Sequence, residues 1–240
     1  MMGVAPPAVP RPDPDNAGVG SAFDNTTIVV LRTALHPFAV RYFHLRKEER
    51  TSMSNTKSHN AIRALVEGAI FVAIAEVLGY IKIWHMPEGG SVSLMMLPII
   101  IYALRWGFGK GLLAGLVLGI LDFMLGGGIA IGWQSILGDY VVAITALGLA
   151  GIGHKKGLPG VIAGSIVGCL GRFICIWVTG VLLWGEYMYD IYGLPMDNEW
   201  IYSFLYNLPV LVSGVLTVII CVVLYNIKPL RKYILGSDIK

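Results

Sequence analysis

The stretch Trp133-Gln134-Ser135-Ile136-Leu137-Gly138-Asp139-Tyr140 opens a run, Val141 to Gly151, in which no residue is charged. Such a run is typical of a membrane helix, where an acid costs about 2.5–3.5 kcal/mol at the helix centre. We therefore expect Asp139 to lie where water, a partner or a ligand offsets this cost. The stretch predicts a polar site at the mouth of a membrane helix, with other apolar helices around it.

The composition of the whole chain is that of an integral membrane protein. Of its 240 residues, 55% are hydrophobic and only 14% are charged, whereas soluble domains have about 25% charged residues. The apolar segments are continuous and do not alternate with a period of two, which favours helices over a β-barrel. We predict an all-α integral membrane protein built as a bundle of six transmembrane helices.

The six predicted spans begin after a segment of different composition. Residues 1–52 contain a Pro-rich stretch at 5–14, which favours a disordered N-terminal extension or a start codon placed too early. Residues 53–240 form the predicted membrane domain. Its expected spans cover about 60–84, 92–104, a segment ending near 125, 134–153, 159–184 and 201–226.

The positions of the basic residues predict the orientation in the membrane. Lys and Arg gather in the connections between spans 2 and 3 and between spans 4 and 5, and in the C-terminal tail. Basic connections of multi-pass proteins stay in the cytoplasm. We therefore expect a cell-membrane protein with both termini in the cytoplasm.

The opposite ends of the predicted helices collect polar and aromatic residues. The candidate ligand-binding residues are Asp139, Tyr140, Trp184, Tyr202 and Asn207. Aromatic faces and a carboxylate suit a cation, and an Asn amide can both donate to and accept from a heterocycle edge. The set indicates a flat, cationic, nitrogen-rich small molecule. The alternative is a belt of Trp and Tyr at the level of the lipid headgroups.

The sequence has no motif of an enzyme or of a nucleotide-binding protein. It contains no Gly-x-x-x-x-Gly-Lys loop, no visible nucleophile–base pair and no cluster with metal-ligand spacing. We expect no catalytic activity, no cofactor and no nucleic-acid partner. A transporter of this kind has to use a gradient or an energising partner protein.

Ala69 and Ala73 are four residues apart in the first predicted span and so share one face of the helix. Small residues at this spacing allow another helix to approach closely. From the spacing alone, the face either packs inside the bundle or docks a partner protein.

The chain resembles the thiamine-specific substrate-binding component of energy-coupling factor (ECF) transporters from about residue 60 to 233. The matching stretches are Glu88-Gly89-Gly90-Ser91-Val92-Ser93, Met96-Leu97-Pro98, Ala103-Leu104-Arg105-Trp106-Gly107, Gly138-Asp139-Tyr140, Leu147-Gly148-Leu149-Ala150-Gly151 and Tyr202 to Asn207.

The resemblance implies a six-helix subunit that binds thiamine at the extracellular side. It also implies docking on a transmembrane coupling subunit that two ATPase subunits drive. By this likeness Asp139 and Tyr140 contact the ligand and Trp184 stacks on it, while Tyr202 and Asn207 complete the site. The face of Ala69 and Ala73 then meets the coupling subunit.

The chain departs from some members of this family at two positions. It has Ile176 where they have a His, and Gly89 where they have a Trp. A related heterocycle such as a thiamine precursor is therefore an alternative ligand. The alternative outside transport is a membrane scaffold that uses the aromatic and acidic loop as a collar for lipid headgroups.

Overall fold

A computed structural model describes residue 41 and residues 58–86, 90–125, 132–188, 190–191, 193 and 195–238. Residues 57–240 form one compact unit, to which the description below is confined. The predicted N-terminal extension over residues 1–52 lies, apart from Arg41, outside the described residues.

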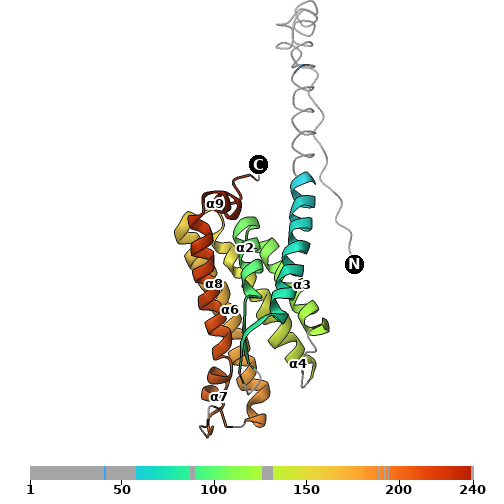
Figure 1. The fold of residues 1–240 in the computed structure, drawn as a ribbon. Coiled ribbons are helices and arrows are strands. Elements are labelled where there is room, and N and C mark those ends of the chain that lie inside the picture. The colour runs from blue at the N-terminus through green and yellow to red at the C-terminus, as the bar shows by residue number, and fades with distance from the viewer. Residues whose placement is uncertain are drawn as a thin grey trace, which may run out of the picture. The chain divides into compact units, whose positions relative to one another are not determined.

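In its described residues the unit is a helical bundle with a small β-hairpin (Figure 1). A helix over 58–80 comes first. The elements that follow are β1 (Lys82–His85), β2 (Ser91–Ser93), α2 (Met96–Trp106), α3 (Phe108–Leu125), α4 (Trp133–Ser135), η1 (Ile136–Val142), α5 (Ala143–Thr145), η2 (Ala146–Gly153), α6 (Gly157–Trp184), η3 (Gly185–Tyr187), α7 (Glu199–Tyr206), α8 (Leu208–Asn226) and α9 (Lys228–Ile234).

Four helical segments of the described residues are long and apolar enough to cross a membrane. They are Phe108–Leu125, Trp133–Gly153, Gly157–Tyr187 and Leu208–Asn226. The protein is thus a mostly helical, multi-pass membrane protein, as the composition predicted. These four segments do not by themselves confirm the predicted count of six spans, because α2 is a shorter apolar helix of 11 residues.

The hairpin corrects the predicted boundaries of the first two spans. The first helix ends at Tyr80, and β1 then pairs antiparallel with β2, so that Trp84 lies opposite Val92. The four residues of β1 are all exposed and include the β-branched Ile83 and the aromatic Trp84, which are residue types that favour a strand. Pro98 is the third residue of α2, in the first turn, where a missing N–H breaks no helical hydrogen bond.

The sixth predicted span is broken at Asn207 into α7 and α8. Pro209 lies in the first turn of α8 and has no N–H to continue the hydrogen bonds of α7. Asn198 caps the start of α7, because its side-chain oxygen accepts from the backbone N–H of Trp200 at 2.9 Å. Figure 1 shows α7 and α9 at opposite ends of the bundle.

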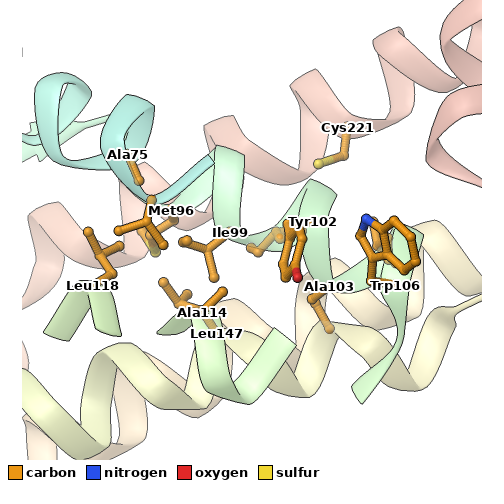
Figure 2. Packing of buried hydrophobic residues seen from close by; sticks show 14 of the residues in the cluster. Ala75, Met96, Ile99, Tyr102, Ala103, Trp106, Ala114, Leu118, Leu147 and Cys221 are labelled. Carbon is orange, nitrogen blue, oxygen red and sulfur yellow. The ribbon is translucent and has the colours of Figure 1, made fainter. Parts of the chain in front are cut away.

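Helix α2 lies in the middle of the apolar core, as Figure 2 shows for Met96, Ile99 and Tyr102. Helix α3 packs beside it through glycines. A Cβ at Gly115 would lie 2.8 Å from the carbonyl oxygen of Ile144, and one at Gly119 would lie 2.7 Å from that of Tyr140. Only glycine permits backbones to approach this closely, so α3 is held directly against α5 and η1.

A cluster of charged residues at the C-terminal end of α2 joins the first helix to the C-terminal residues of the unit. Arg105 is fully buried, and its guanidinium donates to Glu67 at 2.7 Å and to Asp238 at 2.8 Å. Arg63 also pairs with both acids. The ring of Tyr233 lies 3.8 Å from the guanidinium carbon of Arg105. This charge cluster fastens the C-terminal residues to α2 and to the first helix.

Candidate functional site

Asp139 lies in η1, a π-helical segment within the longer span Trp133–Gly153. One oxygen of its carboxylate, Oδ2, accepts two hydrogen bonds. Ser135 Oγ donates at 2.9 Å from the preceding turn, and Trp184 Nε1 donates at 3.0 Å from the end of α6. Wider π-type turns are frequent at functional sites. The structure thus joins two predicted ligand residues that are 45 positions apart in the sequence.

The close approach of η1 to α6 depends on Gly138. A Cβ at this position would overlap the side chain of Thr179 on α6. Without a side chain at Gly138, the backbone of η1 lies against α6 one residue before Asp139. This contact keeps η1 and α6 close enough for the indole of Trp184 on α6 to reach the carboxylate of Asp139 on η1.

Asn207 lies at the break between α7 and α8 and also faces α6. Its Nδ2 donates to the carbonyl oxygen of Ser203 at 2.9 Å, while Ser203 Oγ donates to the carbonyl oxygen of Trp177 at 2.7 Å. A Cβ at Gly180 would lie 3.5 Å from Asn207 Nδ2. Gly180 precedes Trp184 by four residues, so Asn207 and the Asp139–Trp184 pair meet neighbouring turns of α6.

The two predicted tyrosines each pack on another ring. Tyr140 makes an edge contact with Phe123 of α3, with ring centroids 5.3 Å apart. Tyr202 is only 5% exposed and stacks on Tyr206 at 6.0 Å. In this conformation, therefore, Tyr202 is covered and does not present an open face to a ligand.

Sequence reasoning missed a group of charged residues inside the bundle. A cavity of about 280 Å³ has in its lining Glu76, Ser93, Met95, Asp122, Arg172 and Ser213. Glu76 comes from the first helix, Asp122 from α3 and Arg172 from α6. An ionisable residue within an apolar span is itself a signal of function, and Glu76, Asp122 and Arg172 are three such residues. The sequence could not show that they meet.

Ala69 and Ala73 lie on an exposed face of the helix over 58–80. Their larger neighbours on this helix are exposed as well, among them Leu65, Ile70 and Val77. The opposite face packs inward, where the carbonyl oxygen of Ala64 accepts from Tyr102 at 2.8 Å. Among the described residues, therefore, Ala69 and Ala73 are exposed.

Comparisons with known proteins identify the family. The model of a family described as thiamine transporter protein matches residues 65–234. This chain belongs to the thiamine transporter family. Among the relatives of this family member, thiamine transporter ThiT of Bacillus subtilis is 32% identical in an alignment of 180 positions that covers 69% of this chain and 91% of the relative. The ThiT of Lacticaseibacillus paracasei is 31% identical in an alignment of 192 positions that covers 72% of this chain and 92% of the relative.

A solved structure of ThiT from Listeria monocytogenes has the same fold as this thiamine transporter family member. The TM-score is 0.58 at 26% sequence identity, and the match covers 71% of this chain and 97% of the other. These relatives are named as transporters, so the family role is not enzymatic.

Proposed function

We propose that this protein binds thiamine at the outward end of the bundle and takes it up as the substrate-binding component of an ECF-type transporter. The observation that carries the proposal is the hydrogen bond from Trp184 to Asp139 in a member of the thiamine transporter family. The bond sets an aromatic ring and a carboxylate side by side, and this combination suits a flat cation.

Each predicted ligand residue has a role in this proposal. Asp139 provides the charge for the thiazolium cation, and Trp184 provides a ring face. Asn207 reads the edge of the pyrimidine through its amide. Tyr140 and Tyr202 close the site, which for Tyr202 requires the ring to turn away from Tyr206 when the ligand enters.

The proposed partner is a transmembrane coupling subunit driven by two ATPase subunits. The exposed face of Ala69 and Ala73 supports docking there, since small residues let another membrane helix approach closely. An exposed apolar face could also meet lipid alone, and the variant at Ala73 in the Discussion separates the two roles.

The proposed topology has six spans and both termini in the cytoplasm. The helix over 58–80 and α2 are added to the four longer segments. A contact at one end of the bundle supports this arrangement, because His154 Nδ1 donates to the carbonyl oxygen of Leu104 at 2.8 Å beside the basic connections. The hydrogen-bonded pair Asp139–Trp184 is then on the extracellular side.

Calorimetric titration of the purified protein tests the ligand. Thiamine should bind saturably at one site, more tightly than its separate pyrimidine or thiazole fragments. A tighter complex with the pyrimidine fragment would favour the thiamine-precursor alternative. The absence of binding by all three compounds would favour the scaffold alternative and contradict the proposal.

A further inference from the structure

Exposed basic side chains gather where two membrane spans end. They lie in the turn before α6 and in α9, which follows α8 after Ile227. Because Trp184 is the last residue of α6, this end of the bundle is the one away from the proposed ligand site (Figure 1). Together these residues form the basic surface: Lys155, Lys156, Lys228, Arg231 and Lys232.

Tyr225, in the last turn of α8, brings the two parts of the basic surface together. The guanidinium carbon of Arg231 lies 5.8 Å from the centre of the Tyr225 ring. On the other side, a Cβ at Gly157 would lie 3.8 Å from the hydroxyl oxygen of the same tyrosine, and Gly157 directly follows Lys156. Arg231 therefore reaches back over the end of α8, to the level at which both spans end.

Helix α9 keeps its basic residues away from the bundle. At about 100° per residue, Lys228, Arg231 and Lys232 fall within an arc of about 100° around the helix. On the opposite side Ile234 is buried, and the carbonyl oxygen of Tyr233 accepts a hydrogen bond from the charge cluster at 2.6 Å. One side of α9 thus fixes it to the bundle, while the other side presents its charges.

Among the described residues, no acid neutralises the basic surface. All four ion pairs found in that part of the chain belong to Arg63 and Arg105, which occupy the two acids of the charge cluster. Lys228 and Lys232 are four residues apart in one helix, a spacing at which like charges repel and destabilise the helix. An anionic partner would offset this repulsion.

Exposed apolar side chains flank the first of these charges. Ile227 and Leu230 are 44% and 37% exposed, just beyond the end of the span that closes with α8. An anionic phospholipid matches this combination, because its headgroup can meet the cations and its acyl chains can meet the apolar pair. Clusters of about four to eight Lys or Arg beside a membrane span are typical of such lipid binding. A soluble anion would match only the charges.

We propose that the basic surface binds the headgroups of anionic phospholipids and so holds this end of the bundle at the membrane surface. The inference does not depend on the transported ligand. Only the leaflet, which is the cytoplasmic one, follows from the proposed topology. Because the cations are exposed, salt should screen their attraction to the headgroups.

The test is native mass spectrometry of the full chain in detergent, titrated with phosphatidylglycerol or with phosphatidylcholine of the same acyl chains. The wild type should bind phosphatidylglycerol at least about tenfold more tightly, and less so as the ionic strength rises. Arg231→Gln should lower this preference about fivefold, whereas Arg231→Lys should keep it. Lys82→Gln is the matched control, because it removes one exposed charge from the hairpin and should leave the preference unchanged.

A wild type that binds both lipids equally would overturn the inference, and so would an Arg231→Gln protein with the full preference. Equal loss in Arg231→Lys would mean that the shape of this side chain, and not its charge, decides binding. Equal loss in Lys82→Gln would assign the preference to overall charge. If the wild type has no preference and Arg231→Gln fails to assemble with the coupling subunit, the basic surface docks a protein instead. Thiamine binding is measured separately, so the proposed function can fail or stand independently of these results.

Discussion

At the scale of single residues, the site depends on the carboxylate of Asp139, which accepts hydrogen bonds from two side chains. Ser135 and Trp184 both donate to Oδ2 of Asp139, so neither bond uses Oδ1. The bond from Trp184 also occupies the indole N–H and fixes the direction of that edge. A ligand can therefore contact this ring only through its faces. The indole edge of Trp177 is fixed differently, by donation to the carbonyl oxygen of Trp200 at 3.0 Å.

Replacement of Trp184 should therefore remove two signals together. We expect Trp184→Ala to weaken thiamine binding at least about tenfold, because a cation–π contact and ring packing are lost, and to abolish most of the quenching of tryptophan fluorescence. Trp177→Phe is the matched control, since its ring packs on Phe173 and Trp200. Weakened binding with quenching at full amplitude would assign the fluorescence signal to another tryptophan.

Gly138 should be the residue on which the geometry of the site depends most. Gly138→Ala adds a Cβ that overlaps Thr179, and overpacking of this kind costs about 1–3 kcal/mol. We expect a lower melting temperature and weaker thiamine binding. Gly109→Ala in α3 is the control, because a Cβ there would have no atom within 4 Å. Equal behaviour of the two variants would mean that η1 and α6 do not need this close approach.

At the scale of elements, the first helix has two faces with different tasks. One face carries Glu76 toward the cavity and Ala64 toward Tyr102. The other face exposes Ala69 and Ala73. Ligand binding and partner docking are therefore expected to respond to different substitutions in the same helix.

Ala73→Trp should separate these two tasks. A bulky side chain holds a docking helix away and forfeits many small dispersion contacts. The purified variant should bind thiamine with an unchanged dissociation constant. Vesicles that contain it with the coupling subunit and the ATPases should lose thiamine uptake. Val215→Trp on α8, another exposed position, should transport normally. Normal uptake by Ala73→Trp would exclude this face as the docking surface.

At the scale of the whole molecule, the charge cluster around Arg105 connects the C-terminal residues to the first helix. Hydrogen bonds from Arg105 hold the pKa of Asp238 well below its usual range. A carboxyl whose folded pKa is depressed stabilises the protein above its unfolded pKa, near 3.9, and loses this contribution as the pH falls toward the folded value.

We therefore expect Asp238→Asn to lower the melting temperature at neutral pH, and the difference from the wild type to shrink as the pH falls below about 4. The effect should be small, about 1 kcal/mol or less, because Asp238 is partly exposed. Melting curves of both proteins in detergent at several pH values measure it. A difference that grows at low pH would contradict this role of the charge cluster.

Much of the helical architecture followed from continuous apolar runs. The predicted third and fifth spans correspond to α3 and α6, whose ends lie within a few residues of the expected positions. The break at Asn207 was not predicted, although Pro209 indicates it. The hairpin was missed because the short strands β1 and β2 adjoin apolar helices and were read as part of them.

The site was less accessible to sequence reasoning, because it depends on which helices are neighbours. The proximity of Asp139 to Trp184 was inferred from a shared end of the bundle, whereas their hydrogen bond could not be. Glu76, Asp122 and Arg172 belong to three different helices, and only the folded chain brings them to one cavity.

The central claim is that Asp139 binds thiamine in this protein, and the most direct measurement is the dissociation constant of thiamine for Asp139→Asn beside the wild type. Hydrogen bonds to charged groups contribute about 1.5–3 kcal/mol, so binding should weaken at least about tenfold. Asp190→Asn, which removes an exposed acid, should bind as the wild type does. An unchanged dissociation constant in Asp139→Asn would remove Asp139 from the site and contradict the account.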